Sequence, residues 1–146
     1  MKYLNKDITT VTKGIIAHGV NCQGQMGSGV AKAVRTKWPC VYDYYKQMYD
    51  DGEAVMGAVQ LIKLKPDLYV ANLFTQKYYG NDGKVYANKK AVIETIKKLT
   101  LLDEVKHLPI YMPKIGCGLG GLNWNNVKDL INSIVRSDRI YVCEIN

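Results

Sequence analysis

The chain has 146 residues, of which 20 are Lys or Arg and 13 are Asp or Glu, so its formal net charge is +7. This length predicts one domain over residues 1–146, large enough to bury a core without metal or disulfide support. The sequence has no apolar run long enough to cross a bilayer and no charged leader segment, which predicts a soluble, intracellular, cytoplasmic protein without a membrane partner.

Short runs rich in Val, Ile, Leu and Tyr alternate along the chain with stretches of helical periodicity. In chain order we expect strands at 2–5, 14–20, 58–63, 68–74, 107–112 and 139–145, and helices at 29–37, 41–50, 86–102 and 125–136. Pro39 is expected to end the first helix, and Asp51-Gly52 the second. The alternation predicts an α/β fold, a three-layer α/β/α sandwich with a central mixed, largely parallel sheet.

The lysines are spread along the chain, and only Lys89-Lys90 and Lys97-Lys98 are adjacent. This distribution favours a solvated basic surface over a dedicated nucleic-acid patch, so a nucleic-acid partner stays possible but is not favoured. The sequence leaves the oligomeric state open. The four cysteines, Cys22, Cys40, Cys117 and Cys143, form no C-x-x-C pair, which predicts free thiols and no zinc site.

Two glycine-rich turns, at 21–31 and 113–124, each separate a strand-like run from a helix-like run. A turn of this kind lets bare backbone N–H groups approach an anion, and the helix dipole favours negative charge there. Two such turns indicate a diphosphate held from both sides. Because functional turns gather at the carboxyl ends of parallel strands, we expect both turns to face one crevice.

Four segments together resemble a macro domain, an ADP-ribose-binding module: Asp7-Ile8, the strand at 14–21, the glycine loop at 26–31 and the loop at 113–119. The resemblance extends over nearly the whole chain. Residues 18–31 and Leu73-Phe74-Thr75 are most similar to the branch that contains ADP-ribose 1''-phosphate phosphatases and the terminal ADP-ribose glycohydrolase.

The resemblance implies contacts along the whole ligand. Asp7 would accept a hydrogen bond from the adenine amine, with Ile8 beside the ring, although Asp7 is also a natural cap for a short turn. Asn21 would bind the distal ribose, although Asn is an ordinary turn residue too. Around the distal ribose and the phosphates the implied ligand-binding residues are Gly27, Ser28, Gly29, Val30, Ala31, Thr75, Ile115, Gly116, Cys117, Gly118, Leu119 and Gly120.

The resemblance also implies that His18 and Asn21 are catalytic. An imidazole is the usual proton carrier at neutral pH, whereas a lone His on an apolar strand is often a hydrogen-bonded structural residue. Neither glycine loop contains Asp or Glu, which predicts a site without metal, and no cofactor is expected.

The sequence departs from the glycohydrolase pattern at two positions. Residues 119–122 contain no carboxylate where those enzymes have an acid, and either Gln76 or Lys77 falls at the position of their lysine. Hydrolysis of ADP-ribose 1''-phosphate is therefore the favoured function. The alternatives are a non-catalytic module that binds ADP-ribose or a nucleotide signal, and a hydrolase that removes ADP-ribose from protein or nucleic acid.

Overall fold

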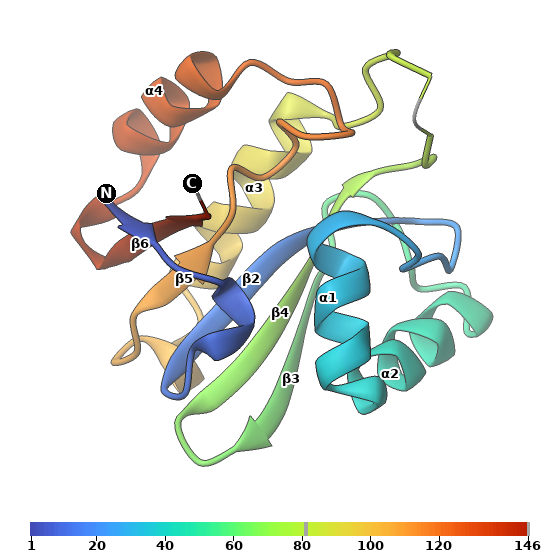
Figure 1. Ribbon diagram of the computed structural model, residues 1–146, viewed down its shortest axis with the longest axis horizontal. Helices are drawn as coiled ribbons and strands as arrows, with labels where there is room; N and C mark the ends of the chain where they lie inside the picture. The colour runs from blue at the N-terminus through green and yellow to red at the C-terminus, as the bar shows by residue number, and fades with distance from the viewer. Residues whose placement is uncertain (81, 146) are drawn as a thin grey trace.

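The computed structural model describes residues 1–80 and 82–145, which form a six-stranded sheet between two layers of helices (Figure 1). The strands lie in the order β1-β6-β5-β2-β4-β3, and every neighbouring pair is parallel except β3 with β4. Their bounds are β1 (Lys2–Asn5), β2 (Gly14–Asn21), β3 (Val59–Lys65), β4 (Leu68–Gln76), β5 (Ile110–Met112) and β6 (Ile140–Glu144).

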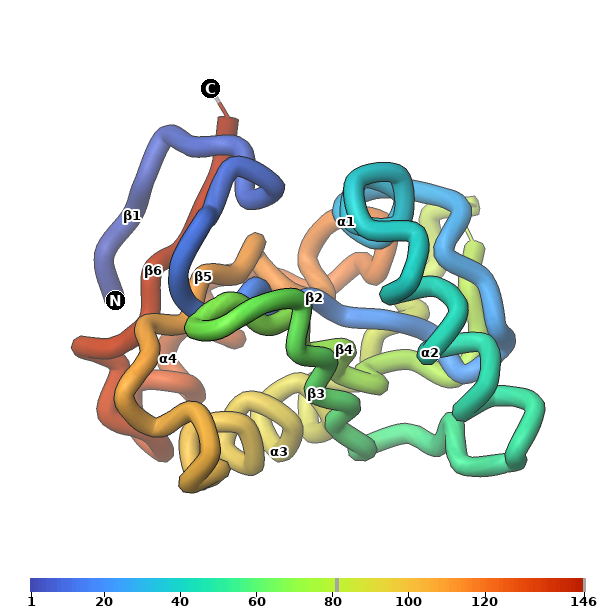
Figure 2. The backbone as a smooth tube through the Cα atoms, turned by 90° about the horizontal axis from the view of Figure 1, so that it is seen from below, coloured from blue at the N-terminus to red at the C-terminus, as the bar shows by residue number. Residues whose placement is uncertain are grey.

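The helices cover the sheet on both sides. α1 (Gly29–Lys37) and α2 (Pro39–Asp50) lie on one face, and α3 (Lys89–Thr100) and α4 (Trp124–Ile134) lie on the other, as Figure 2 shows. This arrangement confirms the predicted three-layer α/β/α sandwich and its mixed, mostly parallel sheet. Within residues 1–80 and 82–145, no helix has the length and apolar composition that a membrane span requires.

Side chains of the central strands alternate between two separate cores. In β2, Ile15 and Ala17 pack toward α3 and α4, whereas Ile16 and Val20 pack toward α1 and α2. The same period of two divides β4, where Leu73 joins the first core and Phe74 the second. Burial on both faces explains why these strands read as nearly continuous apolar runs in the sequence.

The connections after β2 and β5 position the functional site. These two strands are parallel neighbours, but the chain leaves β2 for α1 on one face and leaves β5 for α4 on the opposite face (Figure 1). A point where neighbouring strands send their connections to opposite faces opens a crevice at their carboxyl ends. The two glycine-rich turns occupy these connections, at 22–28 and 113–123.

Two predicted helix starts are wrong by a few residues. α2 begins at Pro39 and not at residue 41, because Pro needs no N–H partner at the first helical position. α3 begins at Lys89 and not at residue 86, because the Asn88 side chain accepts a hydrogen bond from the Ala91 N–H and caps the helix there. α3 and α4 end at Thr100 and Ile134, two residues before their predicted ends.

Two predicted strands are shorter than expected. β5 covers only Ile110–Met112, because the Leu108 N–H is bonded to the Val105 carbonyl and Pro109 has no N–H to offer. β6 begins at Ile140, since Arg139 ends a short 3-10 turn and its guanidinium group bonds to backbone carbonyls at 100, 105 and 108.

The Asn88 cap generates a prediction about stability. Asn88→Ala removes the acceptor for the Ala91 N–H, so the free energy of unfolding should fall by about 1 kcal/mol, measured by urea denaturation. Asn88→Asp is the matched control, because a carboxylate accepts the same bond and should retain most of the stability. Equal losses in both variants would show that the cap does not set the start of α3.

Candidate functional site

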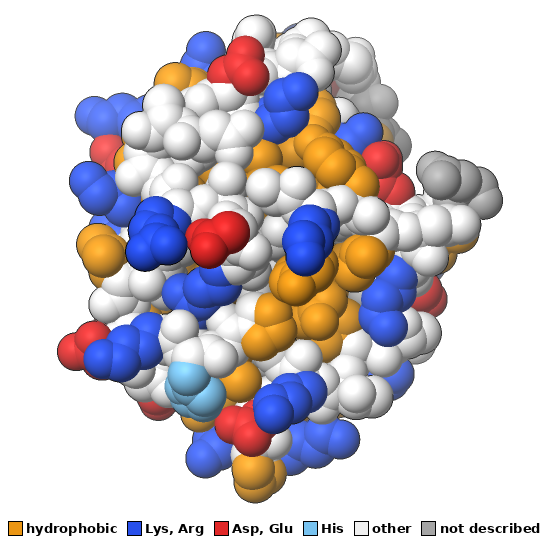
Figure 3. All heavy atoms as spheres, turned by 90° about the vertical axis from the view of Figure 1, so that its left-hand side faces the viewer, with side chains coloured by type: hydrophobic (Ala, Val, Ile, Leu, Met, Phe, Trp, Pro, Cys, Tyr) orange, Lys and Arg blue, Asp and Glu red, His pale blue; other side chains and the backbone are white. Residues whose placement is uncertain are grey.

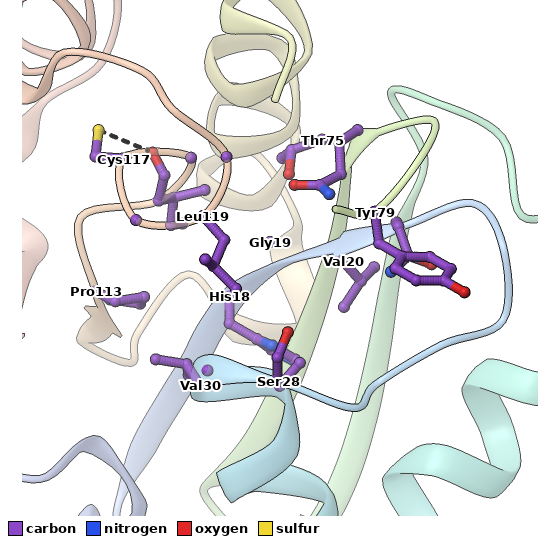
Figure 4. A pocket seen from close by; sticks show the side chains of 18 of the residues that line it. His18, Gly19, Val20, Ser28, Val30, Thr75, Tyr79, Pro113, Cys117 and Leu119 are labelled. Atoms are coloured by element: carbon purple, nitrogen blue, oxygen red, sulfur yellow. Dashed lines mark hydrogen bonds between the residues drawn. The ribbon is translucent and has the colours of Figure 1, made fainter. Parts of the chain in front are cut away.

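A cavity of about 400 Å³ opens at the carboxyl ends of β2, β5 and β6. Figure 4 shows Ser28 and Val30 on one side of it, Cys117 and Leu119 on the other, and His18 between them. The two glycine-rich turns, separated by almost ninety positions in the sequence, thus face each other across one space. This is the arrangement that the sequence predicted from the two turns.

The cavity brings together fourteen of the sixteen residues singled out in the sequence. These are His18, Asn21, Gly27, Ser28, Gly29, Val30, Ala31, Thr75, Ile115, Gly116, Cys117, Gly118, Leu119 and Gly120. Asp7 and Ile8 are not among its lining residues.

The first turn is fixed by Asn21 and Tyr45. The Asn21 Oδ1 atom accepts hydrogen bonds from the Tyr45 hydroxyl at 2.8 Å and from the Gln23 N–H at 3.0 Å, and its Nδ2 donates to the Gln25 carbonyl at 2.9 Å. Tyr45 is completely buried and its ring stacks on Phe74. Asn21 thus shapes the turn, and because an amide nitrogen carries two N–H bonds, one of them is not used by the bonds to the turn.

The second turn depends on a glycine at its start. Gly116 has a φ of +79°, and an added β-carbon would lie 2.9 Å from the Leu122 side chain and 3.1 Å from Ala87. Its carbonyl accepts a hydrogen bond from the Leu122 N–H, and the Gly120 carbonyl accepts bonds from the N–H groups of Tyr86 and Ala87. The turn is thereby held against the segment that precedes α3.

The first turn ends at the N-terminus of α1. Ser28 is the N-cap residue, but its hydroxyl makes no capping hydrogen bond, and Gly29 follows with a φ of +60°. The N–H groups of the first helical turn are therefore not satisfied by Ser28 and lie beside the cavity. Free N–H groups and the positive end of the helix dipole favour an anion at this position.

His18 lies on the floor of the cavity and is only 1% exposed. Its Nε2 atom lies 2.6 Å from the Oδ1 atom of Asn72, whereas Nδ1 is buried and unpartnered among the residues described. Burial lowers the pKa of His18 from 6.5 to about 4, against the opposing effect of the Asn72 hydrogen bond. At neutral pH the ring is uncharged, so it has no imidazolium proton to give.

Asp7 caps the short 3-10 turn Ile8–Thr10. Its Oδ1 atom accepts hydrogen bonds from the Thr9 N–H at 2.9 Å and from the Thr9 hydroxyl at 2.8 Å, and these bonds lower the pKa of the carboxyl group. Asp7 also lies close to the cavity, because the Lys6 N–H bonds to the carbonyl of Glu144, which lines it. The carboxylate is ionised at neutral pH and exposed to solvent.

Sequence reasoning missed a charged pair in the wall of the cavity. Lys114, directly after β5, and Glu144, at the end of β6, both line it, and the Lys114 Nζ atom lies 3.1 Å from Glu144 Oε2. No local motif marks Glu144, because it reaches the site through the pairing of β6 with β5. The other lining residues that were not predicted as ligand contacts are Gly19, Val20, Gln25, Gln76, Tyr79, Gly80, Pro113 and Cys143.

Of the two residues that could fall at the position of the glycohydrolase lysine, Lys77 does not line the cavity. Gln76 does, whereas the Lys77 Nζ atom lies 5.4 Å from the centre of the Tyr78 ring. Lys77 is therefore placed as a surface lysine. Over the described parts of the chain, His, Cys, Asp and Glu do not form a group of three that could hold a metal ion.

The two cysteines in the cavity wall are protonated thiols. Burial raises the pKa values of both Cys117 and Cys143, and the Cys117 Sγ atom lies 3.5 Å from the carbonyl oxygen of Ile115 (Figure 4). Because the thiolate is the nucleophilic form, these positions favour packing over covalent catalysis.

Residues 17–131 match the family model of the Macro domain. The chain belongs to the macro domain family. It is 29% identical to a protein of Debaryomyces hansenii named ADP-ribose 1''-phosphate phosphatase, over 90% of this chain and 92% of that protein. It is 30% identical to the ADP-ribose glycohydrolase OARD1 of Homo sapiens, over 87% of this chain and 78% of that protein.

Solved structures agree with this family assignment. A macrodomain protein from Streptomyces coelicolor superposes with a TM-score of 0.78 at 26% identity, and the match covers 99% of both chains. The macro domain fold is therefore shared over nearly the whole chain.

Lys and Arg side chains do not form one large basic patch on the face shown in Figure 3. Lys and Arg side chains there are scattered among uncharged, apolar and acidic ones. Within the cavity, Lys114 is the one cation among the described lining residues, and it is paired with Glu144. Most of the excess positive charge therefore lies outside the cavity.

The low pKa of His18 predicts how stability depends on pH. The unfolded chain binds a proton at His18 below about pH 6.5, but the folded chain does so only below about pH 4. Stability is therefore fully present above pH 6.5 and falls as the pH drops toward 4, by about 2–3 kcal/mol from this group. Urea unfolding of the wild type and of His18→Gln at about pH 7.5 and about pH 4.5 isolates this contribution. Equal pH dependence in the two proteins would contradict it.

Proposed function

We propose that this macro domain binds ADP-ribose and hydrolyses ADP-ribose 1''-phosphate to ADP-ribose and inorganic phosphate. The main support is the pair of glycine turns that face each other across one cavity, with His18 and Asn21 from β2 between them. The phosphatase name of the Debaryomyces hansenii relative, which matches over nearly its full length, supports the same substrate.

The cavity suits an extended diphosphate ligand. Backbone N–H groups at the start of α1 and in the 116–120 turn approach from opposite sides, and the free N–H of Asn21 is available to a ribose hydroxyl. Asp7, beside Glu144, would accept a hydrogen bond from the adenine amine with Oδ2, since the bonds to Thr9 both use Oδ1. The proposal includes Ile8 beside the adenine ring and Thr75 among the residues around the distal ribose and the phosphates.

The proposed reaction is the hydrolysis of a phosphomonoester. The oxygen of a water molecule forms a bond to phosphorus, the bond from phosphorus to the ribose 1'' oxygen breaks, and that oxygen takes up a proton derived from the water. Preorganised N–H groups of residues 27–30 would stabilise the charge on the phosphoryl oxygens. Since His18 is uncharged at neutral pH, it would accept a hydrogen bond instead of supplying the proton.

Removal of ADP-ribose from a macromolecule is the second candidate, because the human relative is named a glycohydrolase. A covalent lysine route is not supported here, since Lys77 lies outside the cavity wall and residues 119–122 contain no acid. A binding module without turnover is the third candidate. It would share the ligand contacts and lack only the phosphate release.

Asp7→Asn separates the two roles of Asp7. Asn retains an acceptor for the Thr9 N–H, so the free energy of unfolding should change little, but its remaining amide group cannot accept from the adenine amine. We expect ADP-ribose affinity to fall about tenfold, measured by isothermal titration calorimetry. An unchanged affinity would remove Asp7 from the site, and Asp50→Asn is an exposed control that should bind normally.

Phosphate release decides among the three candidates. Purified protein with ADP-ribose 1''-phosphate should release inorganic phosphate without added metal, and His18→Ala should lower the rate by about 100-fold or more while ADP-ribose still binds. Binding of ADP-ribose without any phosphate release would favour the non-catalytic module. Release of free ADP-ribose from a modified protein or nucleic acid would favour the second candidate, and failure of ADP-ribose to bind would overturn all three.

A further inference from the structure

A chain of three side-chain hydrogen bonds runs from the cavity across the sheet to α2. His18 Nε2 lies 2.6 Å from Asn72 Oδ1, Asn72 Nδ2 donates to Gln60 Oε1 at 3.0 Å, and Gln60 Nε2 donates to the Tyr44 carbonyl at 2.9 Å. The chain crosses β2, β4 and β3 in turn. His18 and Asn72 are almost completely buried.

The Tyr44 carbonyl, at the end of this chain of hydrogen bonds, determines which group donates and which accepts in each bond. The Tyr44 carbonyl can only accept, so it faces the NH₂ group of Gln60 and turns the Gln60 oxygen toward Asn72. That oxygen in turn faces the NH₂ group of Asn72 and leaves the Asn72 oxygen facing His18. His18 Nε2 must therefore carry the proton, and Nδ1 is a lone pair without one.

The Nδ1 lone pair is a buried acceptor, unpartnered among the described residues, next to the ligand cavity. A buried polar group without a partner destabilises the protein, and a donor that reaches it would recover that cost. Gly27 and Gly29 of the first glycine turn line the same cavity, and added β-carbons there would meet no atom within 4 Å. The described residues therefore leave open space beside these two glycines.

We propose that Gln60 and Asn72 are positioning residues that hold His18 in the Nε2–H tautomer, so that Nδ1 accepts a hydrogen bond from an O–H group in the cavity. That group is a hydroxyl of the bound ligand or a water molecule beside it. A phosphate oxygen without a proton cannot take this place, because it too is an acceptor. This assignment of the ligand rests on the proposed function, whereas the tautomer does not.

The tautomer can be measured without any ligand. Long-range ¹H–¹⁵N NMR distinguishes a protonated ring nitrogen from an unprotonated one, and the chain has only two histidines, so His107→Gln assigns the His18 signals. We expect His18 to be protonated at Nε2 and not at Nδ1. A signal from the Nδ1–H tautomer, or from a mixture of both, would overturn the proposal even if ADP-ribose binds well.

Gln60→Lys should reverse donor and acceptor in the hydrogen bond from position 60 to Asn72 and in the one from Asn72 to His18. A lysine at this position has only donors, so Asn72 must turn its oxygen toward it and its NH₂ group toward His18, which then shifts its proton to Nδ1. Gln60→Glu is the conservative variant, because its carboxylate still accepts from Asn72 and keeps the Nε2–H tautomer. Gln47→Lys is the matched control, because it adds the same charge on α2, at an exposed position outside these hydrogen bonds.

Binding and turnover in Gln60→Lys distinguish the two sources of the O–H group. A ligand hydroxyl would now meet a donor, so ADP-ribose affinity should fall about tenfold or more, whereas a bound water would leave affinity intact and lower phosphate release instead. If the tautomer of His18 reverses while ADP-ribose affinity and phosphate release both stay unchanged, the proposed role of Nδ1 is wrong.

If Gln60→Lys does not fold, the wild type still provides the test. Saturation with ADP-ribose or ADP-ribose 1''-phosphate should move the Nδ1 resonance of His18 and not that of His107, and a fixed His18 resonance would overturn the proposal. Failure of both compounds to bind would refute the proposed function together with the assignment of the O–H group. The tautomer of His18 would still be decided by the spectrum of the free protein.

Discussion

The parallel pairing of β2 with β5 is the constraint on which the site depends. These strands are separated by about ninety residues in the sequence and become neighbours only when β2 takes the centre of the sheet. Because their connections leave to opposite faces, no helix crosses the space above their carboxyl ends. The two glycine turns then become the walls of one cavity, although neither turn alone encloses a ligand.

The electrostatic attraction of the cavity for an anion comes mainly from main-chain dipoles. Lys114 is neutralised by Glu144, and His18 is uncharged, so an anionic ligand would meet main-chain N–H groups and the N-terminus of α1. Fixed dipoles need little reorganisation when a charge arrives, and exclusion of water strengthens them. The net charge of +7, which lies mostly elsewhere, would act over longer distances on the approach of an anion.

Features encoded locally could be predicted from the sequence, and features created by long-range pairing could not. The glycine turns, most strands and the cavity-lining residues at 27–31 and 115–120 follow from local pattern and family resemblance. Glu144 enters the wall because β6 pairs with β5, and His18 owes its neutrality to burial by segments distant in the chain. α3 begins three residues later than predicted, because the Asn88 cap outweighs the weak helical periodicity of residues 86–88.

Two features of this cavity lack the partners that are usual for such groups. Nδ1 of His18 is buried without a hydrogen-bond partner among the described residues, and Ser28 caps α1 without a side-chain bond. Each such feature costs stability, and a folded chain retains such costs where another requirement outweighs them. The family match identifies the fold and the relatives of this protein. The unpartnered groups, in contrast, mark the cavity through the structure of this chain alone. His18, near the carboxyl end of β2, is singled out both by the family resemblance and by its unpartnered ring nitrogen.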